Sequence, residues 1–127
     1  MLHDSVLGLA HIGIRVHDLA RSRQFYELFG FKYAWGPFGA EQVTALAHSS
    51  GLEINLIVNA PEPSAPNVLM DVAEKHAGFT HVALKIGNVA ATESALALAG
   101  IAISGRRGQN AIFVRDPDGN VLELAAD

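Results

Sequence analysis

The sequence lacks the features that mark secreted, membrane and nucleic-acid-binding proteins. It contains no cysteine, which excludes disulfides and thiolate metal ligands and is compatible with a cytoplasmic protein. Its apolar runs fall well short of a bilayer span, so we expect neither a transmembrane helix nor a membrane partner. The first residues, MLHDSVLGLAHIG, lack the basic start and cleavage site of a signal peptide. The net charge is −4 without a basic run, which argues against nucleic acid as a partner.

The composition is that of one small globular domain spanning residues 1–127. Hydrophobic residues make up 50% of the chain and charged residues 17%, proportions that are typical of folded proteins. A chain of 127 residues is long enough to bury most of the surface that it exposes when unfolded. A small molecule is therefore the expected partner.

The sequence repeats itself. Residues 8–31 align without a gap on residues 78–101, so that His11 falls on His81, 70 positions further along the chain. When the same spacing is carried on, GLEINLI lands on VLELAAD, and Glu53 falls on Glu123. The few identities lie on ionisable and turn residues, which favours a true internal repeat.

Each half of the chain predicts one strand, one helix and three further strands. LAHIGIRV and THVALKI read as buried strands. Asp18 and Asn88 are expected helix N-caps, and Gly30 and Gly100 are expected left-handed C-caps. Three short strands follow each helix, at about 31–36, 41–48 and 52–58, and at about 101–104, 110–115 and 120–125. The predicted fold class is therefore α+β, with two βαβββ modules at about 6–58 and 79–127. A Pro-rich linker, about 59–78, joins them.

The repeated ionisable residues share one face of the predicted sheets. Side chains two apart in a strand point the same way, so His11 points with Gly13 and Arg15, away from the helix-covered core. His81 and Lys85 share the corresponding face of the second module. Apolar neighbours on both sides of Glu53 and of Glu123 place these two carboxylates on that face as well. If the modules pair about a pseudo-twofold axis, the two His and two Glu can converge.

Two imidazoles and two carboxylates balance the charge of one divalent cation. The mixed nitrogen and oxygen set suits Ni, Zn, Co, Mn or Fe, and open coordination positions would let substrate oxygens replace water. Taken singly, a His in an apolar strand is more often a structural residue, and a Glu on a strand is more often solvated. The repeat is what favours a shared metal site.

The segments LAHIGIRVHDLARSRQFYELFGF, LEINLI, GFTHVALKI and DPDGNVLEL resemble the vicinal oxygen chelate superfamily over nearly the whole chain. This superfamily includes glyoxalase I, methylmalonyl-CoA epimerase, fosfomycin-resistance thiol transferases, extradiol dioxygenases and bleomycin-binding proteins. The resemblance implies paired modules forming a cupped mixed sheet around a metal, with the helices on the outer face, often in a homodimer.

The ligand order His, Glu, His, Glu is similar to that of glyoxalase I, a lactoylglutathione lyase. That likeness implies His11, Glu53, His81 and Glu123 as metal ligands. Arg15 stands four residues after the first ligand, as in the glyoxalase I segment that helps to hold the glutathione carboxylate. The position four residues after Glu53 is Ile57, where glyoxalase I enzymes have a glutathione-binding Asn.

The implied reaction is proton abstraction from a small anionic substrate with stabilisation of an enediolate. Glu123 would be the general base, and Glu53 a ligand or second proton-transfer group. The cationic side chains expected at the substrate are those of Arg15, Lys85 and Arg106, and Asn55 is expected there because it shares the face of Glu53. A ring-cleaving dioxygenase of the same superfamily and a non-catalytic drug-binding protein are the alternatives.

Overall fold

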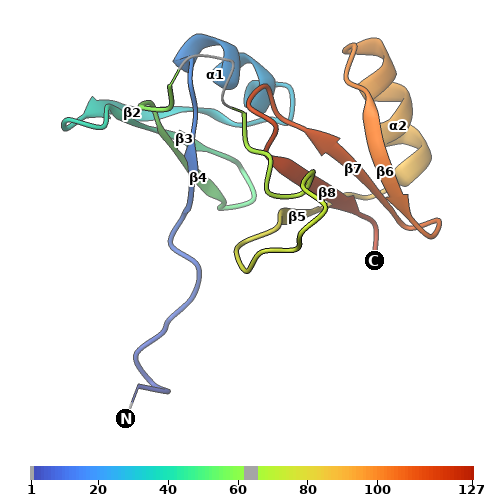
Figure 1. Ribbon diagram of the computed structural model, residues 1–127, viewed down its shortest axis with the longest axis horizontal. Coiled ribbons are helices and arrows are strands. Elements are labelled where there is room, and N and C mark those ends of the chain that lie inside the picture. The colour runs from blue at the N-terminus through green and yellow to red at the C-terminus, as the bar shows by residue number, and fades with distance from the viewer. Residues whose placement is uncertain (1, 62–65) are drawn as a thin grey trace. The chain divides into compact units, whose positions relative to one another are not determined.

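The computed structural model describes residues 2–61 and 66–127, which fall into two compact modules, Met1–Glu62 and Pro63–Asp127. Module 1 contains β1 (Ile12–Arg15), α1 (Leu19–Glu27), β2 (Lys32–Phe38), β3 (Val43–Ala47) and β4 (Glu53–Ile57). Module 2 contains β5 (Val82–Lys85), α2 (Val89–Leu98), β6 (Ile103–Arg107), β7 (Ala111–Arg115) and β8 (Val121–Ala125). Figure 1 shows the same order of elements in both, which confirms the predicted βαβββ repeat. Of the predicted linker 59–78, residues 62–65 lie outside the described range.

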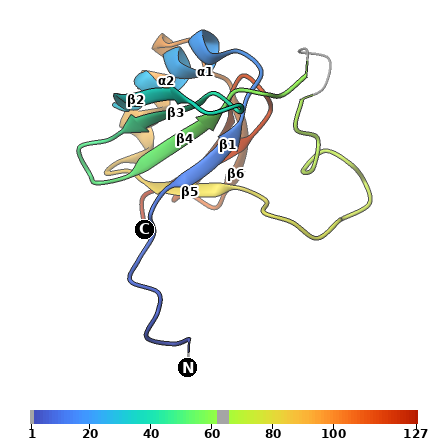
Figure 2. The ribbon, with the colours of Figure 1, turned by 90° about the vertical axis from the view of Figure 1, so that its left-hand side faces the viewer.

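Each module is built on a four-stranded mixed sheet. The strand order is β1-β4-β3-β2 in module 1 and β5-β8-β7-β6 in module 2. The first and last strands of each module run parallel, and the remaining neighbours are antiparallel. In Figure 2 the strands of module 1 lie side by side beneath α1. The arrangement confirms the α+β class.

The helices begin and end where the sequence predicts. Oδ1 of Asp18 accepts a hydrogen bond from the backbone N–H of Arg21 at 3.0 Å, and Asn88 caps α2 in the same way. Gly30 and Gly100 have φ values of 91° and 75°, the left-handed region that glycine adopts without a Cβ penalty. Both glycines belong to a Schellman turn, since the residue after each donates its N–H back to the helix.

The core of each module lies between its helix and one face of its sheet. In module 1 the fully buried side chains of this core include those of Val16, Tyr26, Leu46, Ile54 and Leu56. In module 2 they are those of Ile112, Val114, Leu122 and Leu124, with Leu96 of α2 above them. The alternation places Asn55 and Glu123 on the opposite faces of their sheets, together with small or apolar residues such as Ala45 and Ala111.

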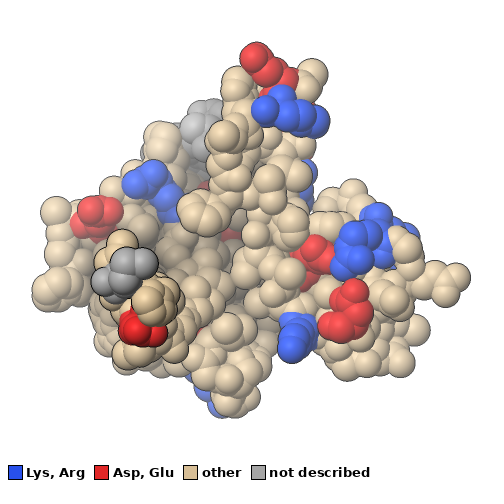
Figure 3. All heavy atoms as spheres, turned by 90° about the horizontal axis from the view of Figure 1, so that it is seen from below, with Lys and Arg blue, Asp and Glu red and all other residues tan. Residues whose placement is uncertain are grey.

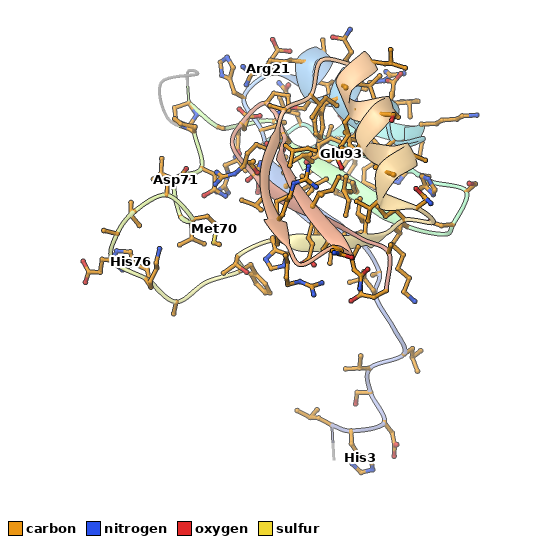
Figure 4. The ribbon with its side chains drawn as sticks, turned by 90° about the vertical axis from the view of Figure 1, so that its right-hand side faces the viewer. His3, Arg21, Met70, Asp71, His76 and Glu93 are labelled. Carbon is orange, nitrogen blue, oxygen red and sulfur yellow. The ribbon has the colours of Figure 1, made fainter. Side chains whose placement is uncertain are left out.

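The turn before β8 is fixed by a buried carboxylate. Oδ1 of Asp116 accepts from the backbone N–H of Asp118 at 2.9 Å and of Asn120 at 2.8 Å. Asp116 and Asp118 are thus turn residues. The segment after the undescribed residues joins the same region, because Asp71, labelled in Figure 4, forms an ion pair with Arg115 at 2.8 Å.

The strand registers of the two modules differ by two residues. In module 1 Ile12 pairs with Ile54, and in module 2 Val82 pairs with Leu122. The first strands are therefore repeated after 70 residues, but the last strands are repeated after 68 residues.

The difference arises in the hairpin between the second and third strands of each module. Trp35 of β2 pairs with Ala45, whereas Gly105 of β6 pairs with Phe113, a hairpin two residues shorter. The β2–β3 pairing has register shifts on both sides of Trp35. The longer first hairpin cannot be recognised from a gapless alignment.

The prediction that Glu53 repeats as Glu123 is therefore wrong. Glu123 pairs with Ala83 of the parallel first strand. The module-1 residue in that place is Asn55, which pairs with Gly13. The gapless spacing holds for the first strand and the helix but fails beyond the hairpin.

Neither helix of the described residues is long and apolar enough to cross a membrane. On the face shown in Figure 3, Lys and Arg side chains lie among Asp and Glu side chains.

Two leucines of α2 provide a matched test of this core. Leu96 is 3% exposed and Leu98 is 91% exposed. We expect Leu96→Ala to lower the free energy of unfolding by about 2–4 kcal/mol, because it leaves a cavity. Leu98→Ala should leave that free energy nearly unchanged, since alanine is also a good helix former. Urea unfolding followed by circular dichroism measures both, and equal losses would contradict the burial of Leu96.

Candidate functional site

His81 and Glu123 are in direct contact on the helix-free face of module 2. Nε2 of His81 lies 2.9 Å from Oε1 of Glu123. The Glu123 side chain is 8% exposed and the His81 side chain 30% exposed, so the carboxylate is buried while the imidazole stays accessible. The contact unites the two ligands predicted for this module.

The imidazole of His81 is held on two further sides. Its Nδ1 lies 2.9 Å from Oγ1 of Thr80, and the ring of Phe113 packs against it edge-on at 5.7 Å between centroids. The Thr80 hydroxyl can accept a hydrogen bond from a protonated Nδ1 or donate one to an unprotonated Nδ1. The 2.9 Å contact of Nε2 with a carboxylate oxygen is a hydrogen bond when Nε2 carries the proton, and a metal ion would bind Nε2 in place of that proton.

Arg107 occupies the second oxygen of Glu123. Its Nε and Nη2 donate to Oε2 of Glu123 at 3.1 and 2.6 Å. This hydrogen bond is the main cause of a lowered pKa of Glu123; burial opposes it and His81 adds a smaller lowering. Glu123 is therefore a carboxylate at neutral pH, with Oε2 held by Arg107 and Oε1 directed at His81.

Arg106 lies on the other face of its strand. It donates to both carboxylate oxygens of Glu93 on α2, one of them at 3.2 Å; Glu93 is labelled in Figure 4. The contact also lowers the pKa of Glu93. Arg106 thus does not share the face of Glu123, where Arg107 lies instead. Strand alternation is the signal that separates the two arginines, but it requires the register of β6.

No hydrogen bond or ion pair joins the candidate residues of module 1 to one another within the described part of the chain. His11, immediately before β1, is exposed, and Glu53, the first residue of β4, is half-buried. Nε of Arg15 donates to Oδ1 of Asn59 at 2.9 Å. Asn55 is 8% exposed, and its Oδ1 is buried without a hydrogen-bond partner among the described residues.

Lys85 is exposed at the end of β5. It has no hydrogen bond or ion pair with any residue in the described ranges 2–61 and 66–127, so its ammonium group is available to an anion.

The donor chemistry fits a divalent metal. An imidazole nitrogen and a carboxylate oxygen face each other in the His81–Glu123 pair, and both are ordinary ligands of first-row metals. The orphaned Oδ1 of Asn55 is a further oxygen donor. Within the part of the chain that the structure describes, no three His, Asp or Glu side chains gather closely enough to form a ligand set. The structure thus provides the His81–Glu123 pair and single donors in module 1.

Two βαβββ modules with a His–Glu pair on the helix-free face define a protein of the vicinal oxygen chelate fold. The chain belongs to the Glyoxalase/Bleomycin resistance protein/Dioxygenase superfamily, whose family model matches residues 8–124. A comparison with curated proteins gives no match.

Solved structures support the same fold. SMU.1112c is similar with a TM-score of 0.74 and 24% identity, over 94% of this chain and 99% of the other. A glyoxylase/bleomycin resistance protein/dioxygenase domain from Frankia sp. EAN1pec has a TM-score of 0.71 and 21% identity, over 95% and 92% of the two chains. A mutant of the fosfomycin resistance protein FosX from Listeria monocytogenes, complexed with Mn(II) and 1S,2S-dihydroxypropylphosphonic acid, has a TM-score of 0.71 and 20% identity, over 95% and 92%.

The separate placement of the two arginines can be tested by titration. We expect Arg106→Gln to raise the pKa of Glu93 toward its ordinary value of 4.5, because the lost hydrogen bond favoured the ionised form. The pair stabilises the fold above that ordinary pKa, and this contribution is lost as the pH falls through the lowered pKa. Both side chains are partly exposed, so the effect on stability should be small.

NMR titration of the Glu93 side-chain carboxyl measures this shift. Arg107→Gln is the matched control and should leave the pKa of Glu93 where it is. A pKa of Glu93 that responds to Arg107 rather than to Arg106 would contradict the assignment of the two faces.

Proposed function

We propose that this chain is a divalent-metal-dependent enzyme of the glyoxalase type that removes a proton from a small anionic substrate. His11, His81 and Glu123 are the proposed metal ligands, and Glu123 is also the proposed general base. The single observation that carries the proposal is the contact between Nε2 of His81 and Oε1 of Glu123, with Arg107 on the other carboxylate oxygen.

A bound divalent ion would supply Lewis-acid polarisation of two adjacent substrate oxygens and stabilise negative charge that develops there. Glu123 would accept the substrate proton, since its lowered pKa keeps it unprotonated at neutral pH. Arg107 would fix the carboxylate by holding Oε2 and leave Oε1 for the chemistry. Thr80 would accept a hydrogen bond from Nδ1–H of His81 in the tautomer whose unprotonated Nε2 binds the metal.

The contact between Arg15 and Asn59 supports a carboxylate-bearing substrate. Glyoxalase I enzymes, which the sequence resembles, have an Asn four residues after the second ligand to bind glutathione, and counting from Glu53 gives Ile57. Counting from Asn55, the counterpart of Glu123, gives Asn59, to which Arg15 donates. The proposed substrate class is therefore a glutathione adduct such as the methylglyoxal hemithioacetal.

The charge of the site also favours an anion. Arg15, Lys85 and Arg107 are cationic side chains on the helix-free faces of the two sheets. Two FosX structures from Listeria monocytogenes are complexes with Mn(II) and either 1S,2S-dihydroxypropylphosphonic acid or a sulfate ion. We propose the same combination of divalent metal and anionic ligand for this chain, with Ni, Zn, Co, Mn and Fe as candidates.

Glu123→Gln tests the proposed base. The amide keeps the side-chain shape and an oxygen donor but cannot accept the proton. We expect turnover of the methylglyoxal–glutathione hemithioacetal to fall by about two to four orders of magnitude, with a much smaller loss of bound metal. Measurements are the rate and the metal content after incubation with each divalent ion. Glu93→Gln, a carboxylate on the helix side, is the control and should leave the rate unchanged.

Other experimental outcomes would change the proposed reaction class. If a proton is abstracted from the substrate and returned to it, deuterium from the solvent should enter the product under anaerobic conditions. Strictly oxygen-dependent turnover would falsify the proposal in favour of a dioxygenase. Tight ligand binding that is indifferent to chelator, with no metal retained, would favour a non-catalytic binding protein.

We further propose that the protein is a homodimer in which two copies share each metal centre. Mixing a His11→Ala chain with a Glu123→Ala chain tests this. If sites are shared, one site of each mixed dimer collects both changes and the other is intact, so metal binding should return to part of its wild-type level. No recovery, despite proven subunit exchange, would place all ligands of a site in one chain.

A further inference from the structure

Asn55 holds in module 1 the place that Glu123 holds in module 2. On the parallel side Asn55 pairs with Gly13, as Glu123 pairs with Ala83. On the antiparallel side it pairs with Ala45, which corresponds to Phe113. Both neighbours therefore identify Asn55 as the structural counterpart of the carboxylate that contacts His81.

Glu53 has no such counterpart. It pairs with Ala47 on β3, and the same place in module 2 is taken by Val121, which pairs with Arg115. Val121 is an apolar residue that is 9% exposed. Nothing on the helix-free face of module 2 therefore repeats the carboxylate of Glu53.

The Asn55 side chain has an unused oxygen. Its residue is 8% exposed, and Oδ1 has no hydrogen-bond partner among the residues that the structure describes. Buried polar atoms are nearly always paired, and an unpaired one points to a missing ion, water or ligand. Oδ1 of Asn55 is thus an oxygen atom that is available to bind a metal ion.

The residues beside Asn55 in the sheet leave space for that partner. Gly13 has no side chain, and a Cβ added to it would have only Cδ1 of Ile57 within 4 Å, at 3.6 Å. Ala45, on the other side, has only a methyl group. Neither of the two directly paired residues therefore has a side chain large enough to fill the position beside Oδ1.

We propose that Oδ1 of Asn55, in place of the Glu53 carboxylate, is the oxygen ligand that module 1 provides to the divalent ion. This inference rests on the proposed function. The ligand set is then two imidazoles, one amide oxygen and one carboxylate, so a bound divalent ion keeps one net positive charge. A centre with an unneutralised charge attracts an anionic ligand more strongly than one with two carboxylates.

Metal titration of the metal-free protein tests this assignment. Co(II) is the probe, and the readouts are its dissociation constant and its visible absorption spectrum, neither of which depends on activity. Asn55→Ala should weaken Co(II) binding about tenfold or more, the scale set by loss of groups around a metal. Asn55→Asp should tighten binding and change the spectrum, because added ligand charge raises affinity. Glu53→Gln, the matched control two residues away, should change neither.

A second titration measures the charge of the centre. Inorganic phosphate added to the Co(II)-loaded protein should bind more weakly to Asn55→Asp than to the wild type, since the new carboxylate removes the net positive charge. If circular dichroism shows that Asn55→Asp does not fold, Asn55→Ser replaces it in the Co(II) titration. Its smaller side chain should weaken Co(II) binding.

The outcomes separate this inference from the proposed function. Loss of Co(II) binding in Glu53→Gln, with Asn55→Ala unchanged, overturns the inference and leaves the metal enzyme intact. Wild-type protein that binds no divalent ion overturns both.

Discussion

Each module depends on one constraint, which is that a mixed four-stranded sheet must bury one face beneath a single helix. Because side chains alternate across a strand, burial of Leu122 and Leu124 commits Glu123 to the opposite face. The same rule in module 1 commits Asn55 to the helix-free face between Ile54 and Leu56. The packing of one face of each sheet therefore places Asn55 and Glu123 on the other face.

The inner strands β4 and β8 hold Asn55 and Glu123 in fixed positions. β8 is bordered by the parallel β5 and the antiparallel β7, so its residues are held from both sides. Glu123 is further held by Arg107 and His81, which leaves its carboxylate little freedom. The Glu123 carboxylate needs no rearrangement to remain ionised, because the guanidinium of Arg107 already lowers its pKa.

The two modules differ at the position held by Asn55 in module 1 and by Glu123 in module 2. Their first strands keep His11 and His81 in step, but the β2–β3 hairpin is two residues longer than the β6–β7 hairpin. The longer hairpin places an amide in module 1 where module 2 has a carboxylate.

The sequence by itself determined the βαβββ order, the helix caps at Asp18 and Asn88, the Schellman glycines and the face that carries His81 and Glu123. These features follow from local periodicity and capping, which act over a few residues. Only the tertiary structure decided which residue faces which across the sheet. The two-residue difference between the hairpins replaced Glu53 by Asn55 as the counterpart of Glu123, and the register of β6 placed Arg107 rather than Arg106 beside it. Hydrogen bonds between strands distant in sequence set that register, and hydrophobic alternation is unchanged by a shift of two residues.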